Sequence, residues 1–529
     1  MLRMLSHHAV LIEELKDQLQ ASMLNVEKYQ QQCDHYQKES RIHQQEADIW
    51  KDKYHHLLEQ LALAKQQRFA PSSERDPAQG DLFFNEAEAA KPQETDTTVT
   101  VAEHTRKSKP KRASLPDHLP REVIECDIAE QEKRCACGCM KERFGEEVTE
   151  QLCVIPAQIK VIQYVRPKYA CKVCEQGVSI APMPKLLLPK SMASSSLVAY
   201  TITSKYVDHL PLYRQEAIWQ RYGVTIPRNT SCDWLMKTAG ICMPLLDHLK
   251  HDILHAPYIQ ADETTAQVLK EPNRSNQQKS YVWVYQGNAP NNKIILYDYQ
   301  ETRAGKHAEN FLETYKGYLQ TDGYAGYHWV DNKKDIIHLG CMAHARRPFM
   351  KLMKLAKKTG KSYQIVALIK KLYLIEKITR DKRLSHAERF MLRLEKSKPL
   401  LDKIKDWLDK AVTTTPPKGA LGKAIRYMLD RWDQLCAFLQ HGMLEIDNNG
   451  AENAIRPFAL GRKNWLFAAS PRGAKASMLF YSLIMTCKAN DIEPFAYFNV
   501  MLKQIPHCKT QEDYKALLPY NIAEFKSST

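Results

Sequence analysis

The sequence predicts a multidomain α+β protein in which a mixed α/β core is interrupted by an all-helical insertion. Three observations lead to this prediction. The chain has 529 residues, which is too long for one ordinary hydrophobic core. A heptad pattern covers residues 1–68, and strand-like runs follow between residues 258 and 339. An almost wholly helical stretch, Ala343–Met443, then separates these strands from the last acidic motif.

Residues 1–68 are predicted to form one long helix that self-associates. Alternate steps of three and four residues from Leu5 pass through Ile12, Leu19 and Val26 and continue to Ala64. A heptad pattern of this length predicts a coiled coil, and its few polar interruptions fit a device that sets register or partner number. We therefore expect a homo-oligomer. A single helix packed on another domain is the alternative.

The next two segments are predicted to be a linker and a small metal-binding module. Residues 69–112 are rich in Pro, Ser, Thr, Glu and Lys, which predicts a flexible linker. Its basic end, Arg106–Arg112, can lie along phosphate groups or remain solvated. Residues 113–190 contain Cys135-Ala-Cys137-Gly-Cys139 and Cys171-Lys-Val-Cys174. Because no apolar signal core precedes them, metal ligation is expected rather than disulfides.

The cysteine spacing suits a tetrahedral structural Zn²⁺ site, because thiolates are its preferred ligands and each short pair can hold one ion. Cys139 competes for a place in the first pair, and reduced buried thiols are the alternative for the whole cluster. The predicted zinc ligands are Cys135, Cys137, Cys171 and Cys174.

Residues 191–256 are predicted to be helical. One helix can end at Gly223, Val224–Pro227 can turn, and Thr230 or Ser231 can begin the next helix. This arrangement resembles a helix-turn-helix unit, although an ordinary helical hairpin fits equally well. Near the start of the second helix, the candidate DNA contacts are Arg228 and Asn229.

Five strands and one helix are predicted for residues 257–342. Three alternating runs are predicted to form a meander: Tyr258–Ala261, Ser280–Tyr285 and Lys293–Tyr299. A helix within Thr302–Tyr315 follows, and then strands at Gly317–Thr321 and Asp335–Leu339. This order of three strands, a helix and two strands is that of an RNase H-like core. The core is predicted to resume after the helical insertion.

Three acids are predicted to converge on divalent metal. Asp262 follows the first strand, Asp322 follows the fourth, and Glu452 lies one turn into a later helix. Two Mg²⁺ (or Mn²⁺) ions held by carboxylates can activate a hydroxyl nucleophile and stabilise the leaving oxygen of a phosphodiester. We expect Asp262 to bridge both ions, Asp322 to hold one and Glu452 the other. Glu263 is expected to be an indirect neighbour or a solvated acid, and Asp447 is the rival third ligand.

Positive charge is concentrated in the predicted insertion. Lys and Arg far outnumber Asp and Glu between Arg346 and Arg431, and this excess accounts for the whole of the net charge of +15. Such a surface suits nucleic acid, with a solvated helical face as the alternative. Cys341-Met-Ala-His344 has zinc-like spacing but no second pair nearby, so a structural or DNA-facing role is expected for it. Further candidate DNA contacts are Arg346, Arg347, Arg456, Arg462, Lys463 and Arg472.

Motifs along nearly the whole chain carry a family likeness. They include His209–Gln215, Ala261–Thr264, Thr321–Tyr324, Cys341–Arg347, Asn448–Pro457 and Gly461–Phe467. In combination they resemble the DDE-class transposases of the bacterial insertion-sequence sixty-six family, specifically the large transposase subunit. Two departures from the family pattern are the crowded C-x-C-x-C and Asn453, where Arg is common.

The resemblance implies an RNase H-like catalytic core and cut-and-join chemistry at the terminal inverted repeats of an insertion sequence. It places the catalytic acids at Asp262, Asp322 and Glu452. Double-stranded DNA, as element ends and as target, is the implied partner, together with accessory proteins of the same element. A catalytically silent DNA-binding regulator and an RNase H-like nuclease that never joins strands remain alternatives.

No run of apolar residues is long enough for a membrane span, so no membrane partner is expected. We expect a bacterial cytoplasmic protein associated with the nucleoid. The predicted division of the chain is a coiled coil at 1–68, a flexible basic linker at 69–112, a zinc-binding module at 113–190, a helical DNA-binding region at 191–256, the first part of the core at 257–342, a basic helical insertion at 343–445, the second part of the core at 446–503 and a C-terminal tail at 504–529.

Overall fold

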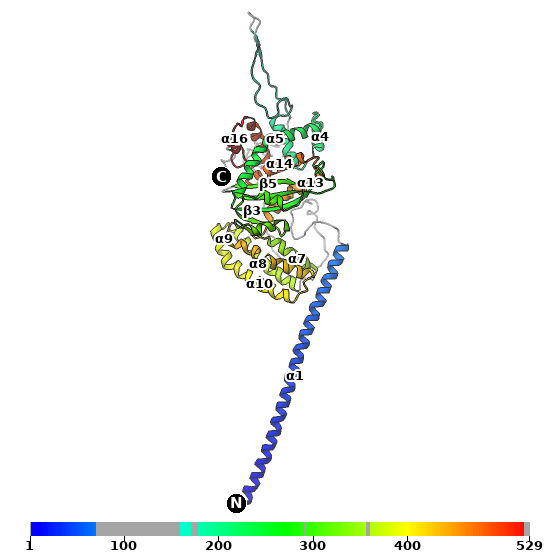
Figure 1. The fold of residues 1–529 in the computed structure, drawn as a ribbon, viewed down its shortest axis with the longest axis vertical. Coiled ribbons are helices and arrows are strands. Elements are labelled where there is room, and N and C mark those ends of the chain that lie inside the picture. The colour runs from blue at the N-terminus through cyan, green and yellow to red at the C-terminus, as the bar shows by residue number, and fades with distance from the viewer. Residues whose placement is uncertain (1, 70–158, 171–177, 290–291, 356–359, 523–529) are drawn as a thin grey trace, which may run out of the picture. The chain divides into compact units, whose positions relative to one another are not determined.

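The computed structural model describes residues 2–69, 159–170, 178–289, 292–355 and 360–522 (Figure 1). The predicted linker and most of the predicted zinc-binding module lie outside the described residues. The same holds for Cys135, Cys137, Cys171 and Cys174.

Leu2–Phe69 forms a single helix of 68 residues, α1, as the heptad pattern predicts. Several of its large apolar side chains are more than half exposed, including Leu19, Val26, Tyr29 and Trp50. An isolated helix leaves such side chains in water, whereas a coiled-coil partner would cover them. Oligomerisation through α1 therefore stays a prediction with a clear physical reason.

A short antiparallel hairpin and three helices precede the main sheet. The hairpin pairs β1 (Lys168–Ala170) with β2 (Val178–Ile180). The helices are α3 (Ser195–Tyr206), α4 (Leu212–Arg221) and α5 (Arg228–Leu254).

The turn between α4 and α5 contains Gly223 at φ 77, as predicted for a glycine-containing turn. The predicted start of the next helix at Thr230 or Ser231 was wrong, because α5 already begins at Arg228. Pro227 is the N-cap residue, in an extended conformation with φ −61° and ψ 142°. Its missing N–H costs no helical hydrogen bond there, because N–H groups at the start of a helix have no acceptor within the helix.

The main sheet has five strands in the order β5-β4-β3-β6-β7. β3 (Tyr258–Ala266), β4 (Ser280–Ala289) and β5 (Asn292–Gln300) form the predicted antiparallel meander. β6 (Gly317–Gln320) pairs in parallel with β3, and β7 (Ile336–Leu339) pairs in parallel with β6. The predicted helix is the short α6 (Lys306–Phe311), and an unpredicted 3₁₀ helix, η1 (Ala325–Asn332), lies between β6 and β7.

Strand β3 continues beyond its predicted end. Asp262 pairs with Val284 of β4, and the antiparallel ladder runs on to Ala266, so the prediction that Asp262 ends the strand was wrong. Thr264 and Thr265, which are β-branched, favour this continuation. On the other side of β3, however, the parallel ladder with β6 stops at Gln260. Asp262 therefore lies where β3 parts from its parallel neighbour.

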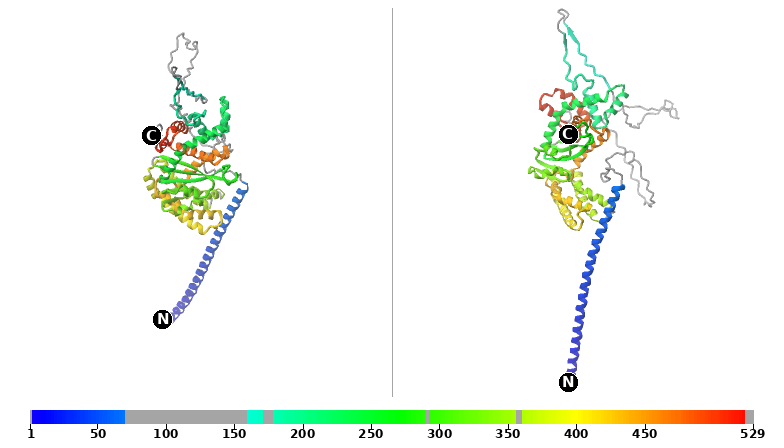
Figure 2. Two further views of the ribbon diagram at one scale, coloured as in Figure 1. Left: turned by 45° about the horizontal axis from the view of Figure 1, so that its top comes forward. Right: turned by 45° about the vertical axis from the view of Figure 1, so that its right-hand side comes forward.

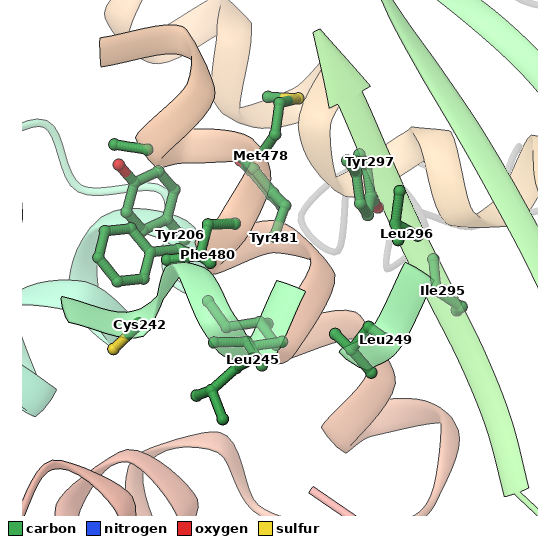
Figure 3. Packing of buried hydrophobic residues seen from close by; sticks show 14 of the residues in the cluster. Tyr206, Cys242, Leu245, Leu249, Ile295, Leu296, Tyr297, Met478, Phe480 and Tyr481 are labelled. Carbon is green, nitrogen blue, oxygen red and sulfur yellow. The ribbon is translucent and has the colours of Figure 1, made fainter. Parts of the chain in front are cut away.

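Helices α5 and α14 (Pro471–Ala489) pack against the meander and build the larger hydrophobic core (Figure 3). Leu245 and Leu249 of α5, Tyr297 of β5 and Tyr481 of α14 all contribute buried side chains to this core. The Tyr297 backbone N–H donates to Ser482 Oγ at 2.8 Å. A hydroxyl of α14 thus occupies a backbone donor on the edge strand, which protects that edge.

Along the chain, a helical segment follows β7 and precedes helix α13, as predicted. It is the mainly yellow group of helices in Figure 2. Its apolar side chains form a second buried core that includes Ile369, Ile404 and Ile425. This segment therefore has its own hydrophobic core beside the sheet. Its elements are α7 (Met342–Leu355), α8 (Lys361–Asp381), α9 (His386–Leu392), η2 (Arg393–Ser397), α10 (Lys398–Thr413), α11 (Ala420–Asp430), α12 (Trp432–Cys436) and η3 (Ala437–Gln440).

A proline favours a kink or an end of a helix, but helix α13 spans Asn449–Trp465 and continues past Pro457. Ala454 and Phe458 on either side of Pro457 are buried in the larger core. Their packing outweighs the backbone hydrogen bond that proline cannot donate. The chain ends its described part with α15 (Pro494–Gln504), η4 (Ile505–His507) and α16 (Gln511–Ala516).

None of the helices among the described residues has the length and apolar character needed to cross a membrane.

Candidate active site

The register between β3 and β6 brings the two predicted aspartates together. Tyr258-Ile-Gln-Ala-Asp262 and Tyr318-Leu-Gln-Thr-Asp322 share Tyr, Gln and Asp at the same spacing. Tyr258 lies opposite Tyr318 and Gln260 opposite Gln320 in the parallel ladder. Because parallel strands advance together, both aspartates emerge at corresponding positions. Ligand oxygens of Asp262, Glu263 and Asp322 all lie within 4.8 Å of one another.

Negative charge is crowded at Asp262. Burial, and then the nearby carboxylates Glu263 and Asp322, raise the pKa of Asp262 well above its usual value. Asp262 Oδ1 accepts the backbone N–H of Glu263 at 2.9 Å, and Asp322 Oδ1 accepts that of Tyr324 at 2.9 Å. In the described part of the chain, neither aspartate forms an ion pair with a basic side chain. A cation would relieve this crowding.

Glu263 has a different role from its neighbour. Arg303 donates to Glu263 Oε1 from Nε at 2.8 Å and from Nη2 at 2.6 Å. Tyr327 donates its hydroxyl to Oε2 at 2.9 Å. The Glu263 side chain is fully buried, so the alternative of a solvated acid was wrong. Glu263 is an already paired neighbour of the two aspartates, and the sequence pointed to neither Arg303 nor Tyr327.

Helix α13 presents Glu452 in its first turn, and Asn448 fastens the start of this helix to the sheet. Asn448 Nδ2 donates to the backbone oxygen of Ala261 at 2.8 Å, directly before Asp262. Asn448 occupies the N-cap position of this helix. Its side chain caps no N–H of the helix, however: Nδ2 is turned toward β3, and Oδ1 has no hydrogen-bond partner in the described structure. The bond links the positions of Glu452 and Asp262.

Glu452 lies in a cluster next to the aspartates. Its Oε1 is 3.4 Å from His344 Nδ1 and 3.7 Å from Arg347 Nη2. Burial and then the Arg347 charge lower the pKa of His344, against the effect of Glu452. Glu452 is close enough to contribute to the raised pKa of Asp262. The ligand atoms that lie within 4.8 Å of one another around Glu452 belong to Cys341 and His344, however, and form a group separate from Asp262 and Asp322.

Two buried glutamines tie the loop before α13 to both strands. Gln260 Nε2 donates to Gln320 Oε1 at 2.8 Å and to the backbone oxygen of Asp447 at 2.9 Å. Gln320 Nε2 donates to the backbone oxygen of Glu445 at 3.0 Å. A Cβ at Gly450 would lie 2.0 Å from Gln260 Oε1, so a larger residue there would push the Gln260 amide out of this network. The matching Gln positions in the two strand sequences are the signal from which this network was predictable.

Asp447, the rival third ligand, points elsewhere. Its side chain is buried, and burial raises its pKa. Asp447 Oδ1 accepts the backbone N–H of Asn449 at 3.2 Å, and so caps the start of α13 locally. Neither metal-like group of the described residues includes Asp447.

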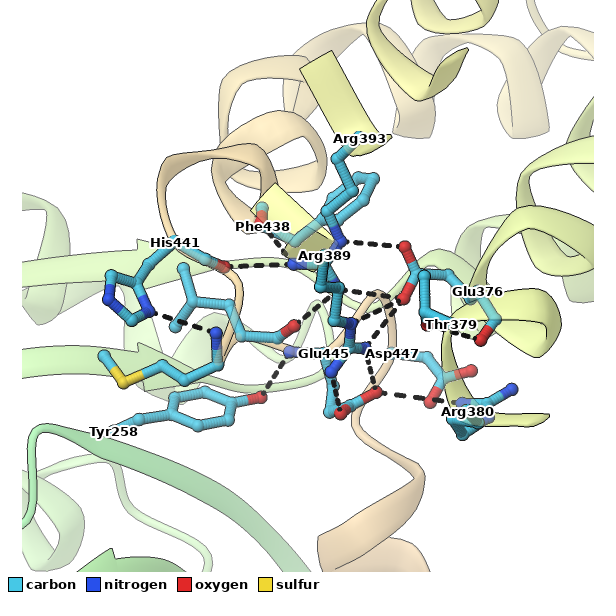
Figure 4. A network of polar contacts seen from close by, with 12 residues as sticks. Tyr258, Glu376, Thr379, Arg380, Arg389, Arg393, Phe438, His441, Glu445 and Asp447 are labelled. Carbon is cyan, nitrogen blue, oxygen red and sulfur yellow. Dashed lines mark hydrogen bonds and ion pairs between the residues drawn. The ribbon is translucent and has the colours of Figure 1, made fainter. Parts of the chain in front are cut away.

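A buried arginine clamp, formed by Glu376, Arg389, Arg393 and Glu445, joins the helical segment to the same loop (Figure 4). Arg393 donates to Glu376 Oε1 and Oε2 at 2.8 Å each and to the backbone oxygen of Leu444 at 2.7 Å. Arg389 donates to both oxygens of Glu445 at 2.9 Å. Burial alone would raise the pKa of Glu376, but the two arginines hold it below its usual value. The clamp therefore orders the loop that leads to Glu452.

The predicted DNA contacts fall into two groups. Arg228, Asn229, Lys463 and Arg472 are exposed, and Arg456 is partly exposed. Contacts inside the protein are described for Arg462, Arg346 and Arg347. Arg462 Nη1 donates to Thr265 Oγ1 at 2.9 Å, and the Arg346 guanidinium stacks 4.6 Å from the Tyr373 ring centre. Arg347 lies beside Glu452. DNA binding by all these residues stays a prediction.

Comparison with known families matches four parts of the chain. The Transposase IS66 family matches residues 190–476, and the IS66 C-terminal element matches residues 482–520. The zinc-finger binding domain of transposase IS66 matches residues 132–175, a range that contains all four predicted zinc ligands. The domain described as Transposase C of IS166 homeodomain matches residues 56–124. The zinc-finger match supports Zn²⁺ as a bound metal.

Similar proteins occur in Sinorhizobium fredii (strain NBRC 101917 / NGR234). Uncharacterized protein y4jD is 34% identical over 77% of this chain and 81% of its own length. Uncharacterized protein y4hP is 32% identical over 89% of this chain and 86% of its own length. With the family match over residues 190–476, these likenesses show that the chain belongs to the IS66 family of transposases.

Proposed function

We propose that this protein binds the terminal inverted repeats of its insertion sequence and catalyses divalent-metal-dependent cleavage and transfer of DNA strands. The observation that carries the proposal is the close pair Asp262 and Asp322, which lacks a cationic partner among the described residues. Membership of the IS66 transposase family supports the reaction class. The strand order β5-β4-β3-β6-β7 supports an RNase H-like core with the helical segment as its insertion.

The residues present fit a divalent cation. Ligand oxygens of Asp262 and Asp322 lie within 4.8 Å of each other, which is close enough for both to hold one ion. Burial and the neighbouring carboxylates raise the pKa of Asp262. Glu452 Oε1 is a buried atom without a hydrogen-bond partner in the described structure. Hard oxygen ligands of this kind suit Mg²⁺ or Mn²⁺. Such ions, when bound by the three acids, would polarise the attacking hydroxyl and the leaving oxygen of the phosphodiester.

The protein's own groups hold the three acids in place. β3 carries Asp262 on a strand paired to β4, and the Tyr324 amide orients Asp322. Asn448 couples the start of α13, and hence Glu452, to Ala261. Arg347 beside Glu452 can meet a phosphate oxygen of the substrate. This arrangement places charged groups on rigid elements before the substrate arrives, which favours catalysis.

A strand-transfer assay with inverted-repeat DNA ends and Mg²⁺ tests the proposal. Cleavage followed by joining to a target supports it. Binding of ends without cleavage would instead identify a catalytically silent regulator, and cleavage without joining would identify a nuclease. The full-length protein should be used with its zinc retained, because the proposed ligands Cys135, Cys137, Cys171 and Cys174 lie in the matched zinc-finger domain.

Deletion of residues 1–68 is expected to lower the oligomeric state of the protein. Exposed apolar residues along α1, such as Leu19 and Trp50, would be covered by a second copy of the helix. Light scattering after size-exclusion chromatography gives the mass of both proteins. An equal number of chains in the full-length and shortened proteins would refute the coiled-coil prediction.

Removal of charge from the helical segment is expected to weaken the salt dependence of DNA binding. Lys370, Lys371 and Lys377 of α8 are exposed, and the slope of log K against log salt should fall by roughly one unit for each lysine that no longer neutralises a phosphate. The triple Gln variant should be compared with a matched triple variant at the exposed Lys293, Lys503 and Lys515. Equal slopes for the two variants would show that these lysines of the helical segment form a solvated surface and do not contact DNA phosphates.

A further inference from the structure

Cys341, His344 and Glu452 form a compact group of unlike metal-ligand side chains. Cys341 directly precedes α7, His344 lies in the first turn of that helix, and Glu452 faces them from α13. One ligand atom from each residue lies within 4.8 Å of the others. Thiolate, imidazole and carboxylate together are a typical ligand set for Zn²⁺, whereas Mg²⁺ prefers oxygen alone.

A second observation concerns two polar atoms that face each other. His344 Nδ1 and Glu452 Oε1 are 3.4 Å apart. Both are buried and have no hydrogen-bond partner in the described structure. Buried polar atoms are normally satisfied, so this pair requires an explanation. A cation held between the imidazole nitrogen and the carboxylate oxygen would satisfy both atoms.

We propose that Cys341, His344 and Glu452 bind a borderline-soft divalent ion such as Zn²⁺, and that this ion withdraws Glu452 from the Mg²⁺-dependent reaction. Binding replaces the proton on Cys341 Sγ, which is released to solvent as the sulfur–metal bond forms. The fourth position is left for water. The ion would thus inhibit the transposase reversibly, and this inhibitory consequence rests on the proposed function.

Two neighbours set the strength of the site. Burial raises the pKa of the Cys341 thiol, and the Asn448 backbone N–H, which donates to Sγ at 3.2 Å, opposes this effect only in part, so the ion must displace a firmly held proton. Arg347 Nη2 lies 3.7 Å from Glu452 Oε1 and opposes a second cation there. The Arg347 side chain is 36% exposed, so it can turn toward solvent when an ion binds. An Arg347→Gln variant should therefore bind the ion more tightly than the wild type.

Titration of the full-length, zinc-loaded protein with Co²⁺ tests the site without reference to activity. Co²⁺ bound to a thiolate gives a sulfur-to-cobalt charge-transfer absorption. In the wild type, we expect one equivalent of this absorption in addition to any from the zinc-finger domain. In Cys341→Ser, we expect this additional equivalent to be missing. Cys487→Ser, which removes a buried thiol of α14, should retain it. Absence of the absorption in the wild type, or its persistence in Cys341→Ser, would overturn the proposal.

His344→Ala provides a second variant should Cys341→Ser fail to fold. His344 is partly exposed, and its loss should weaken Co²⁺ binding at least tenfold while the protein keeps its melting temperature. Unchanged Co²⁺ affinity in His344→Ala would also count against the site. In cleavage assays, Zn²⁺ should inhibit the wild type and inhibit Cys341→Ser less. If the wild-type protein does not cleave DNA, the proposed function fails. The cobalt titration still decides whether the metal site exists.

Discussion

Strand cleavage by an Asp262→Asn variant is expected to fall by about a thousandfold or more, while binding to inverted-repeat DNA survives. A ligand oxygen of Asp262 lies within 4.8 Å of one from Asp322, and an amide in its place can neither bridge two cations nor concentrate negative charge. The cleavage rate of labelled end DNA in Mg²⁺ measures the first effect, and a filter-binding assay measures the second.

The same substitution should stabilise the metal-free protein, since it removes a buried charge that Glu263 and Asp322 repel. Its melting temperature in a chelator should therefore exceed that of the wild type. Asp335→Asn is a suitable control, because Asp335 is an exposed acid beside β7 that pairs with Lys316. Wild-type cleavage by Asp262→Asn, or a parallel loss of DNA binding, would refute the assigned role.

A Glu376→Gln variant is expected to unfold about 3–5 kcal/mol more easily than the wild type, because it leaves the buried Arg393 without its carboxylate partner and Arg389 with Glu445 alone. Glu376 is fully buried, and so is Arg393, so solvent does not screen this change. Denaturant unfolding followed by circular dichroism gives the free energy. Glu395→Gln, at an exposed position of η2, is the matched control. A loss no larger than that of the control would show that the arginine clamp contributes little.

The clamp also predicts how stability depends on pH. Because the folded protein lowers the pKa of Glu376 from its usual value of 4.5, its stabilising contribution is complete above that value. The contribution is lost as the pH falls through the lower pKa of the folded state. Wild-type protein should thus lose stability more steeply than Glu376→Gln in this acidic range, and parallel curves would contradict the expectation.

Local patterns were sufficient to predict most of the secondary structure. α1, the five strands and the helical segment all lie where periodicity and turn residues placed them. Errors arose where tertiary packing or pairing outweighed local preference. β4 extends β3 beyond Asp262, and the buried face of α13 carries that helix through Pro457.

The candidate site was predictable where its geometry follows from register. The repeated Tyr-x-Gln-x-Asp pattern and a parallel ladder together explain why Asp262 and Asp322 meet. Arg303, which neutralises Glu263, comes from a loop distant in sequence, and nothing in its local sequence marks it. The same is true of the arginine clamp, whose members become partners only when α8, α9 and the loop before α13 pack together. Such long-range partners require the folded structure.

The central claim is that Asp322 and its neighbours bind the divalent cation that supports strand cleavage. Cleavage by an Asp322→Cys variant in Mg²⁺ and in Mn²⁺ tests this claim most directly, because sulfur is a poor ligand for Mg²⁺ and a better one for Mn²⁺. We expect almost no cleavage in Mg²⁺ and a clear recovery in Mn²⁺, with DNA binding unchanged in both. Cleavage at the wild-type rate in Mg²⁺, or an equal loss in both ions, would contradict the claim.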